Sequence, residues 1–558
     1  MASYDYVIAG AGSAGCALAS RLTEDLSVTV LLIEAGGHGR HLFIRMPAAN
    51  GFVFGKPRFD WSYRTEPQPE LDGRRVYWPR GRGLGGSSSI NGMIYIRGNA
   101  RDYDGWRQQG LEGWAYADVL PYFRRSEGNP RGDDHFHGAD GPLRTGPAGN
   151  VATIDRVFLE AARQAGYPEN RDFNGATQFG CGIYDMTVHG GRRFNTAWAY
   201  LRRAESRPNL TVMTDARVLE VAFEGTRASG VTVGHGGGRE TVRAAREVIV
   251  ALGAIGSPQL LMLSGLGPAD DLRRLGLTVR ADLPGVGANL HDHLNVPVQY
   301  RCLDPAMTFA RYLRADRALA LGLRYLLTGG GPGAAPFWSA GAFKAVDPGA
   351  EVPSHQVFFT PMVIVEDPRG KDAGAQRHRS FGAGMLTRGK YAVDGFQFDV
   401  NPMRPRSRGA LRLGSAEARD PPIIDPRYMT EEPDRRDMIE AVRIGREIAH
   451  QKAFDAIRGE ELSPGAALGS DAEILSGVRR IAISGYHPVG TCKMGIASDS
   501  TAVVDAALRV RGVESLRVVD ASVMPTLVTG NTNGPTIMIA EKAADMILGR
   551  VPLPRAEV

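Results

Sequence analysis

The chain has 558 residues, which is too long for one simple domain and predicts roughly two to four. Hydrophobic residues make up 43% of it and charged residues 23%, a globular balance that excludes disorder over any long stretch. The net charge of +5 comes from short groups of mixed sign, so the charge does not indicate a nucleic-acid-binding protein.

The cysteines and the apolar runs bear on the compartment. The cysteines form no C-x-x-C pair, which predicts neither a zinc site nor a disulfide framework: Cys16, Cys181, Cys302 and Cys492. No apolar run reaches the ~18 residues of a membrane span, and the first strand begins too early to leave room for a signal peptide. We therefore expect a soluble cytoplasmic protein that binds no metal and whose contact with a membrane is at most peripheral.

The first 34 residues predict a dinucleotide-binding βαβ unit. Residues 4–9 are typical of a buried strand, residues 13–25 of a helix rich in Ala and Leu, and residues 28–33 of a second strand. A G-x-G-x-x-G turn joins the first strand to the helix, and Glu34 ends the second strand. This order and spacing favour a cofactor site over a merely structural turn, but they suit FAD and NAD equally.

Each glycine of the turn has an expected task. Gly10 permits the turn, Gly12 lets the backbone approach a pyrophosphate, and Gly15 allows close packing of helix and strand. The helix N-terminus at Ser13 attracts phosphate charge, and Glu34 is expected to accept hydrogen bonds from a ribose.

A second glycine-rich segment spans residues 81–92. Its composition resembles a linker, but apolar and aromatic residues flank it on both sides. We expect backbone amides of Gly85, Gly86 and Ser87 to form an anion-binding nest, with Asn91 supplying a side-chain amide.

The rest of the chain leaves the cofactor domain and returns to it. Strands of that domain are expected at residues 210–213, 217–223, 228–233, 247–251 and 516–520, with a closing helix at 536–548. The region between predicts a covering domain, with a helix at 318–327, strands near 357–363 and 396–400, and a mobile lid at 367–390.

Among the 12 histidines, two groups are candidates for chemistry. His291 and His293 flank Asp292, but no second cluster supplies further metal ligands, so hydrogen bonding within a loop is favoured; His135 and His137 are interpreted in the same way. His487 sits in a Gly-Tyr-His-Pro turn and suits a general base, since its unperturbed pKa lies near neutral pH. Spacing alone leaves a structural role for His487 about as plausible.

Five segments in order along the chain resemble the motifs of the glucose, methanol and choline (GMC) oxidoreductase family, nearest to its choline and alcohol dehydrogenase-like members. They are GRGLGGSSSIN at 81–91 continuing to Tyr95, Gly98 and Asp104; GAIGSPQLLMLSGLG at 253–267; GVGANL at 285–290; HPVG at 487–490; and DASVMP at 520–525 continuing to Asn531.

The resemblance implies FAD, with the first turn on its ADP half and residues 81–95 beside the flavin. It also implies that Val218 contacts the adenine and that Asp520 and Ala521 lie near the ribityl chain and pyrophosphate. The expected cofactor residues are Gly10, Gly12, Ser13, Ala14, Gly15, Glu34, Ala35, Trp61, Gly83, Gly85, Gly86, Ser87, Asn91, Gly92, Met93, Ile94, Val218, Ala251, Gly253, Tyr486, Asp520, Ala521 and Asn531.

The implied fold is α/β (α+β). A discontinuous Rossmann-like FAD-binding domain is expected over residues 1–150, 205–296 and 480–558. A substrate-binding domain built on an antiparallel sheet is expected over residues 151–204 and 297–479.

The implied reaction is oxidation of a primary or secondary alcohol. His487 takes the hydroxyl proton, Asn531 hydrogen-bonds the developing alkoxide, and a hydride passes to flavin N5. The partners are a small-molecule alcohol and an electron acceptor, with a quinone or dye-like acceptor favoured over oxygen. The alternatives are an oxygen-using alcohol oxidase and a flavin-containing lyase without redox chemistry. A non-catalytic flavoprotein is disfavoured, because both candidate catalytic positions are filled.

Two departures from the family pattern narrow the expectation. Ile90 occupies the place where some relatives carry a histidine bound covalently to FAD, which predicts a non-covalent flavin. Ser339 stands where choline dehydrogenases have an acidic residue that faces the trimethylammonium group, so a neutral, partly apolar alcohol is expected. Nearby aromatic residues serve either the substrate or the core: Phe337, Trp338, Phe343, Phe358 and Phe359.

Overall fold

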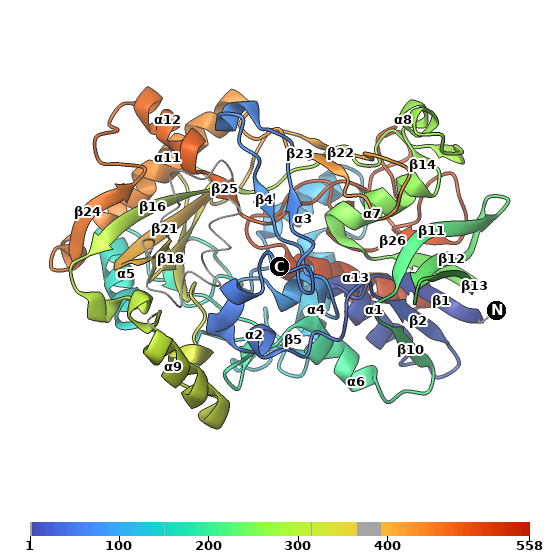
Figure 1. Cartoon of the computed structure of the whole chain (residues 1–558), viewed down its shortest axis with the longest axis horizontal. Helices are drawn as coiled ribbons and strands as arrows, with labels where there is room; N and C mark the ends of the chain where they lie inside the picture. Colours follow the sequence, from blue (N-terminus) through green and yellow to red (C-terminus); the bar gives the residue numbers. More distant parts are fainter. Residues whose placement is uncertain (1–2, 150, 314, 365–391) are drawn as a thin grey trace.

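The computed structural model describes residues 3–149, 151–313, 315–364 and 392–558. Over these ranges the chain builds two large β-sheets, one mixed and one antiparallel, which lie on the right and on the left of Figure 1. The mixed sheet and the helices on it give the α/β fold that the sequence predicts. The segment predicted as a lid, residues 367–390, falls outside the described residues.

The mixed sheet carries the dinucleotide-binding topology. Its strands are Ser3–Ala9 (β1), Val30–Ile33 (β2), Leu210–Met213 (β10), Arg217–Glu224 (β11), Arg227–His235 (β12), Gly238–Val250 (β13) and Leu516–Val518 (β26). The order is β10-β2-β1-β13-β12-β11, and β26 also pairs with β13. Strands β10, β2, β1, β13 and β26 run parallel, whereas β11, β12 and β13 form an antiparallel meander.

Two helices from opposite ends of the chain pack together beside this sheet (Figure 1). Helix α1 (Ser13–Leu22) follows the glycine turn, and α13 (Asn533–Leu548) closes the fold. The small residues of α1 permit close packing, and Arg21 on α1 binds the buried carboxylate of Glu541 on α13 at 2.8 Å. The C-terminal segment is thereby fixed against the first βαβ unit.

The antiparallel sheet has the order β24-β16-β21-β18-β17-β7, and β25 pairs with β16. Its strands are Gly180–Ile183 (β7), Leu294–Cys302 (β16), Ala340–Lys344 (β17), His355–Thr360 (β18), Gly395–Pro402 (β21), Arg458–Ser463 (β24) and Ile483–Ser484 (β25). All of these pairings are antiparallel.

The two faces of the antiparallel sheet differ in chemistry. Side chains alternate along a strand, so Phe396, Phe398 and Val400 of β21 face the core, where α11 (Glu432–Ala449) and α5 (Thr153–Gln164) pack. The opposite face of β21 carries polar residues at 397, 399 and 401. That polar face is turned toward the mixed sheet, where the candidate site lies.

Most predicted elements exist with shifted ends. The predicted strand at 247–251 is the last part of the longer β13, because the chain leaves the β12 turn directly into an extended strand. The predicted strand at 357–363 divides into β18 and the short β19 (Val363–Ile364). The predicted helix at 318–327 is the core of α9 (Ala315–Thr328).

The predicted domain boundaries remain a prediction. Strand β16 crosses the boundary at residue 296, and β25 joins the antiparallel sheet from a segment assigned to the cofactor domain. In the described part of the chain, no helix combines the length and the apolar character needed to cross a membrane.

Candidate functional site

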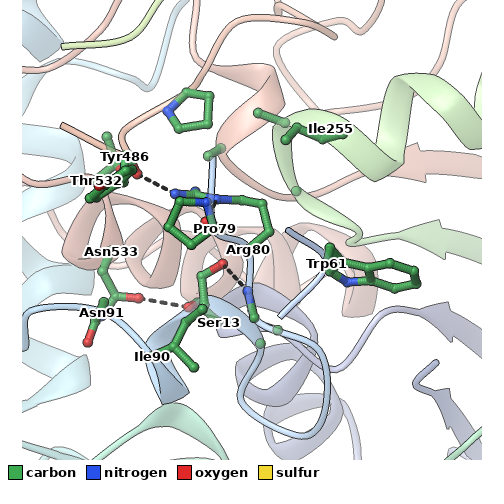
Figure 2. Close-up of a pocket in the computed structure, with 18 of the residues that line it drawn as sticks. Ser13, Trp61, Pro79, Arg80, Ile90, Asn91, Ile255, Tyr486, Thr532 and Asn533 are labelled. Atoms are coloured by element: carbon green, nitrogen blue, oxygen red, sulfur yellow. Dashed lines mark hydrogen bonds between the residues drawn. The ribbon is translucent and has the colours of Figure 1, made fainter. Parts of the chain in front are cut away.

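A cavity of about 370 Å³ is lined by residues from both sheets. One wall is built from the ends of β1, β2 and β13 and the N-terminus of α1. The other wall is the polar face of β16, β18 and β21, and the loop that holds His487 joins the two. Figure 2 shows part of the lining, with Arg80 near the centre, Ser13 below it and Trp61 to one side.

Most of the predicted site residues lie together on this cavity. Those that line it are Gly10, Gly12, Ser13, Ala14, Glu34, Ala35, Trp61, Gly86, Ser87, Asn91, Gly92, Met93, Ile94, Val218, Ala251, Gly253, Tyr486, His487, Asp520, Ala521 and Asn531.

Gly15, Gly83 and Gly85 were predicted at the cofactor but lie behind the lining. A Cβ on Gly15 would stand 1.8 Å from the carbonyl oxygen of Gly10, so this glycine serves the packing of the turn. The amides of Gly83 and Gly85 donate to Glu34 and Ala11 at 3.0 and 2.8 Å. All three support the cavity wall from inside the protein.

Gly12 leaves space for a group bound in the cavity. A Cβ there meets nothing nearer than the carbonyl oxygen of Ala251 at 4.0 Å, so the protein's own packing does not demand glycine. Helix α1 begins directly after it, with no side chain capping its first amides and no acidic residue in its first turn. These free amides suit a pyrophosphate, as the predicted FAD requires.

Glu34 is fixed by backbone amides. Its two carboxylate oxygens accept from the amides of Ala11, Gly36 and Gly83 at 2.9 to 3.1 Å. Burial raises the pKa of this carboxyl, and the three amides oppose that rise. Glu34 therefore locks the glycine turn to the second glycine-rich segment while it lines the cavity.

The predicted anion-binding nest at residues 85–87 is wrong in part. The amide of Gly85 donates to Ala11 and that of Gly86 to Gly83, both at 2.8 Å, so neither is free for an anion. The local chain folds back on itself, because Gly85 and Gly86 both adopt the left-handed conformation.

Asn91 presents its amide nitrogen to the cavity. Its carbonyl oxygen Oδ1 accepts from the Met93 amide at 3.1 Å and from the Arg193 guanidinium at 2.7 Å. With Oδ1 engaged, Nδ2 is the group left to face a ligand. Arg193, which no sequence motif indicated, thus fixes the orientation of Asn91.

His487 stands at the centre of a chain of hydrogen bonds. Its Nε2 lies 3.1 Å from Nδ2 of Asn531, and its Nδ1 lies 3.0 Å from Nδ1 of His293. His293 in turn places Nε2 3.1 Å from the carbonyl oxygen of Met403. At the other end, Gln356 donates to Oδ1 of Asn531 at 3.3 Å.

This series of hydrogen bonds determines which ring nitrogen of His487 carries the proton. The Met403 carbonyl only accepts, so Nε2 of neutral His293 carries the proton and its Nδ1 is an acceptor. His487 must then donate from Nδ1, which leaves Nε2 without a proton. Burial lowers the pKa of His293 to about 4, which keeps its ring neutral. The unprotonated Nε2 of His487 is the nitrogen beside Asn531 in the cavity.

Burial first, and then the neighbouring His293 and Arg80, lower the pKa of His487 well below its usual range. Its backbone amide donates to Asp292 at 2.6 Å, and Asp292 also accepts from Tyr428 and Ser484 at 2.5 Å each. The His-Asp-His segment was predicted to make only loop hydrogen bonds. In the structure, two of its residues hold His487 in place.

Arg80 is a lining residue that the sequence did not indicate. Its guanidinium donates to the Tyr486 carbonyl at 2.7 Å (Figure 2), and burial lowers its pKa. Ser13 and Asn533 are also joined across the cavity floor, at 2.7 Å.

The predicted substrate residues divide into two groups. Phe337, Trp338 and Phe358 line the cavity, whereas Phe343 and Phe359 do not and belong to the hydrophobic core. Ser339 is buried outside the lining, and its hydroxyl donates to the Pro336 carbonyl at 3.1 Å. Because Ser339 does not line the cavity, its lack of charge does not indicate whether the substrate is neutral or cationic.

Several polar residues of the lining were missed because they alternate with apolar residues on three distant strands. They are Asn295, Thr360, Gln397 and Asp399. A mixed polar and apolar strand is the usual pattern of a half-exposed sheet, so nothing in the sequence marks these positions.

Family models described as GMC oxidoreductase match residues 4–295 and 405–540, in the order of that family's N- and C-terminal parts. The chain belongs to the GMC oxidoreductase family. As the sequence predicted, this GMC protein is an FAD-dependent enzyme that oxidises a CH–OH group and passes the electrons to an acceptor.

Curated relatives and solved structures cover nearly the whole GMC chain. It is 48% identical to the mitochondrial choline dehydrogenase of Mus musculus, covering 99% of this chain and 90% of that protein. It is 45% identical to the oxygen-dependent choline dehydrogenase of Brucella anthropi, covering 99% and 97%. Pyridoxine 4-oxidase from Mesorbium loti superposes with a TM-score of 0.86 at 32% identity, covering 98% and 100%. Formate oxidase from Aspergillus oryzae gives 0.88 at 26%, covering 98% of each chain.

Proposed function

We propose that His487 is the general base of the alcohol oxidation. The observation that carries this proposal is the hydrogen-bond chain from Met403 through His293, which leaves Nε2 of His487 unprotonated beside Asn531. The lowered pKa of His487 keeps that nitrogen available at neutral pH.

In this proposal Asn531 orients the alcohol. Gln356 holds Oδ1 of Asn531, so its Nδ2 is the group that donates to the hydroxyl oxygen and to the alkoxide that develops there. Nε2 of His487 accepts the hydroxyl proton. FAD, which the glycine turn and the first amides of α1 would hold, would supply the acceptor for the hydride of the carbinol carbon.

We also propose that the FAD is held without a covalent bond. Ile90 lines the cavity at the position where some relatives carry a histidine, and its side chain packs with Ile44, Val53 and Phe59. An aliphatic side chain cannot bond to the flavin. Denaturation in acid should therefore release all of the FAD into the supernatant.

The proposed electron acceptor is a lipid-soluble quinone rather than oxygen. Supporting this, α9 exposes four leucine side chains by 54 to 80%, on one side of the helix: Leu319, Leu323, Leu326 and Leu327. The helix lies at the outer edge of the molecule (Figure 1), and it also exposes Arg317 and Arg324. Exposed leucines with flanking arginines suit an anionic lipid surface, where such a quinone is dissolved.

The acceptor and the membrane contact have separate tests. Peroxide release in air is compared with reduction of a quinone analogue under nitrogen; faster peroxide release would favour the oxidase. Sedimentation with anionic vesicles should carry the protein down, and a Leu323→Glu, Leu327→Glu variant should stay in solution. We also propose that the protein is cytoplasmic. The proposed cofactor and substrate domains meet after residues 150, 204, 296 and 479.

Anaerobic mixing with a panel of alcohols tests the function itself. The panel includes choline, because two relatives are named as choline dehydrogenases. At least one alcohol should bleach the flavin absorbance. If none does, while a cyanohydrin is cleaved with no change in the flavin spectrum, the lyase alternative replaces the proposal.

A further inference from the structure

A carboxylate stands on the cavity wall formed by β16, β18 and β21, which we call the substrate wall. Asp399 on β21 is 4% exposed and lines the cavity. It accepts three hydrogen bonds, from Asn295 at 3.2 Å, Thr360 at 3.1 Å and Gln397 at 2.8 Å. All three partners donate, which is the arrangement that stabilises an ionised carboxylate.

Among the described residues, no cationic side chain balances the charge of Asp399. Throughout the described ranges, no lysine, arginine or histidine forms an ion pair with it. Each of its three partners is neutral. A buried carboxylate without a cation is costly, so a cationic ligand would be strongly favoured here.

Beside Asp399, Asn295 has a carbonyl oxygen that accepts no hydrogen bond from the described residues. Its amide nitrogen points to Asp399, which turns its carbonyl oxygen Oδ1 the other way. That oxygen is buried and has no hydrogen-bond partner among the described residues, and the residue is 7% exposed. A buried acceptor left empty calls for a donor from the ligand.

The strand register relates this pair to the proposed catalytic residues. On β18, Gln356 contacts Asn531, and Gln356 lies opposite Asn401 of β21. Asp399 is two residues further along β21 on the same face, so its Cα lies about 7 Å from that of Asn401. A small ligand can therefore reach the proposed catalytic pair with one end and Asp399 with the other.

We propose that the substrate is a short amino alcohol whose protonated nitrogen keeps at least one N–H, held between Asp399 and Oδ1 of Asn295. The carboxylate takes the positive charge, and the amide oxygen takes an N–H. Phe358, which lies opposite Asp399 on β18, and Trp338 supply aromatic faces to the same region. This inference rests on the proposed function and names its substrate class.

Two other classes satisfy this site less well. A quaternary ammonium alcohol such as choline balances Asp399 but has no N–H for Asn295. A neutral polyol fills Oδ1 of Asn295 but leaves the charge of Asp399 without a partner. Sites that hydrogen-bond a substrate group discriminate strongly against analogues that lack it.

The test is anaerobic flavin reduction by the holoenzyme at neutral pH. The panel is 2-(dimethylamino)ethanol, 2-(methylamino)ethanol, choline, the neutral isostere 3,3-dimethylbutan-1-ol, and glycerol. The compared quantity is the rate constant of flavin reduction divided by the dissociation constant of the alcohol. For at least one N–H-bearing ammonium alcohol, this ratio should be roughly tenfold higher than for choline and roughly 100-fold higher than for the neutral isostere. Choline in first place would overturn the N–H requirement, and the isostere or glycerol in first place would overturn the charge requirement.

Two variants test whether Asp399 and Asn295 determine the preference for N–H-bearing ammonium alcohols. Asp399→Asn should reduce the preference for ammonium over the neutral isostere by roughly 30-fold or more. The matched control is Asp437→Asn on α11, which makes the same change on the opposite face of the sheet and should keep the preference. An unchanged preference in Asp399→Asn with full FAD content would refute the assignment.

Asn295→Leu serves as a second variant if Asp399→Asn does not fold. It should reduce the preference for N–H-bearing amines over choline, and an unchanged preference would contradict the role of Asn295. Failure of the proposed function gives a different result, since then no alcohol of any class bleaches the flavin.

Discussion

The two walls of the cavity are built by different means. The wall formed by the ends of β1, β2 and β13 and the start of α1, which we call the cofactor wall, consists largely of backbone. It holds a glycine turn, the free end of α1, and the carboxylate of Glu34, which three amides fix. The substrate wall consists of side chains from β16, β18 and β21, which are far apart in the sequence. Backbone geometry leaves a motif in the sequence, whereas a set of side chains from distant strands leaves none.

The largest effect is expected where the walls meet, at His487. His487→Ala should slow alcohol-driven flavin reduction by roughly 100- to 10,000-fold, because the proton acceptor is lost. FAD content should not change, since the glycine turn is untouched. Stopped-flow absorbance measures the rate, and His135→Ala, in an exposed loop, is the control. A rate near that of the wild type would remove His487 from the proposed role.

The cofactor wall is tested at Gly12. Gly12→Val should fold, since no protein atom crowds that side, but its side chain would occupy the space of the pyrophosphate. Displacing the phosphate from the first amides of α1 should weaken FAD binding by roughly 100-fold or more. Fluorescence titration of the apoprotein measures the affinity. Gly105→Ala, where a Cβ also meets nothing within 4 Å, is the control, and equal affinities would contradict the account.

The support behind His487 is tested at His293. His293→Ala removes the acceptor for Nδ1 of His487 and should slow flavin reduction by roughly 5- to 100-fold. His293→Asn keeps an oxygen acceptor and should recover part of the rate. If both variants lose the same activity, packing rather than proton placement explains the effect.

The smallest effect is expected at Ser339, which was predicted to face the substrate. Ser339→Ala should leave the relative rates for different alcohols within about twofold, because the residue does not line the cavity. Relative rates over the alcohol panel measure this. A larger change in discrimination would restore Ser339 to the substrate wall.

Sequence reasoning predicted the fold well where the pattern is local. The βαβ unit at residues 4–33 and α13 appear in one stretch of chain each, so periodicity and glycine spacing identify them. The nest at Gly85 and Gly86 was mispredicted, because the sequence does not show that nearby carbonyls already use those amides.

The residues of the site could be predicted only where they lie in a short continuous motif. His487 and Asn531 lie in short motifs, so a family resemblance points to them. Asp399 was missed because it sits in the alternating strand β21, and its meaning depends on Asn295, which lies 104 positions away in the sequence. Pairings between distant strands are created by the fold, and one sequence alone does not reveal them.

The pH dependence of flavin reduction in the wild-type enzyme shows whether Nε2 of His487 is unprotonated at neutral pH. A neutral alcohol is used, so that only the protein titrates. The lowered pKa of His487 means that its base form persists below pH 6.5, and it is lost only as the pH falls through the lowered value. The rate should therefore be flat from about pH 7 to 9 and decline only below pH 6.5. A decline that begins above pH 7 would contradict an unprotonated His487 held by His293.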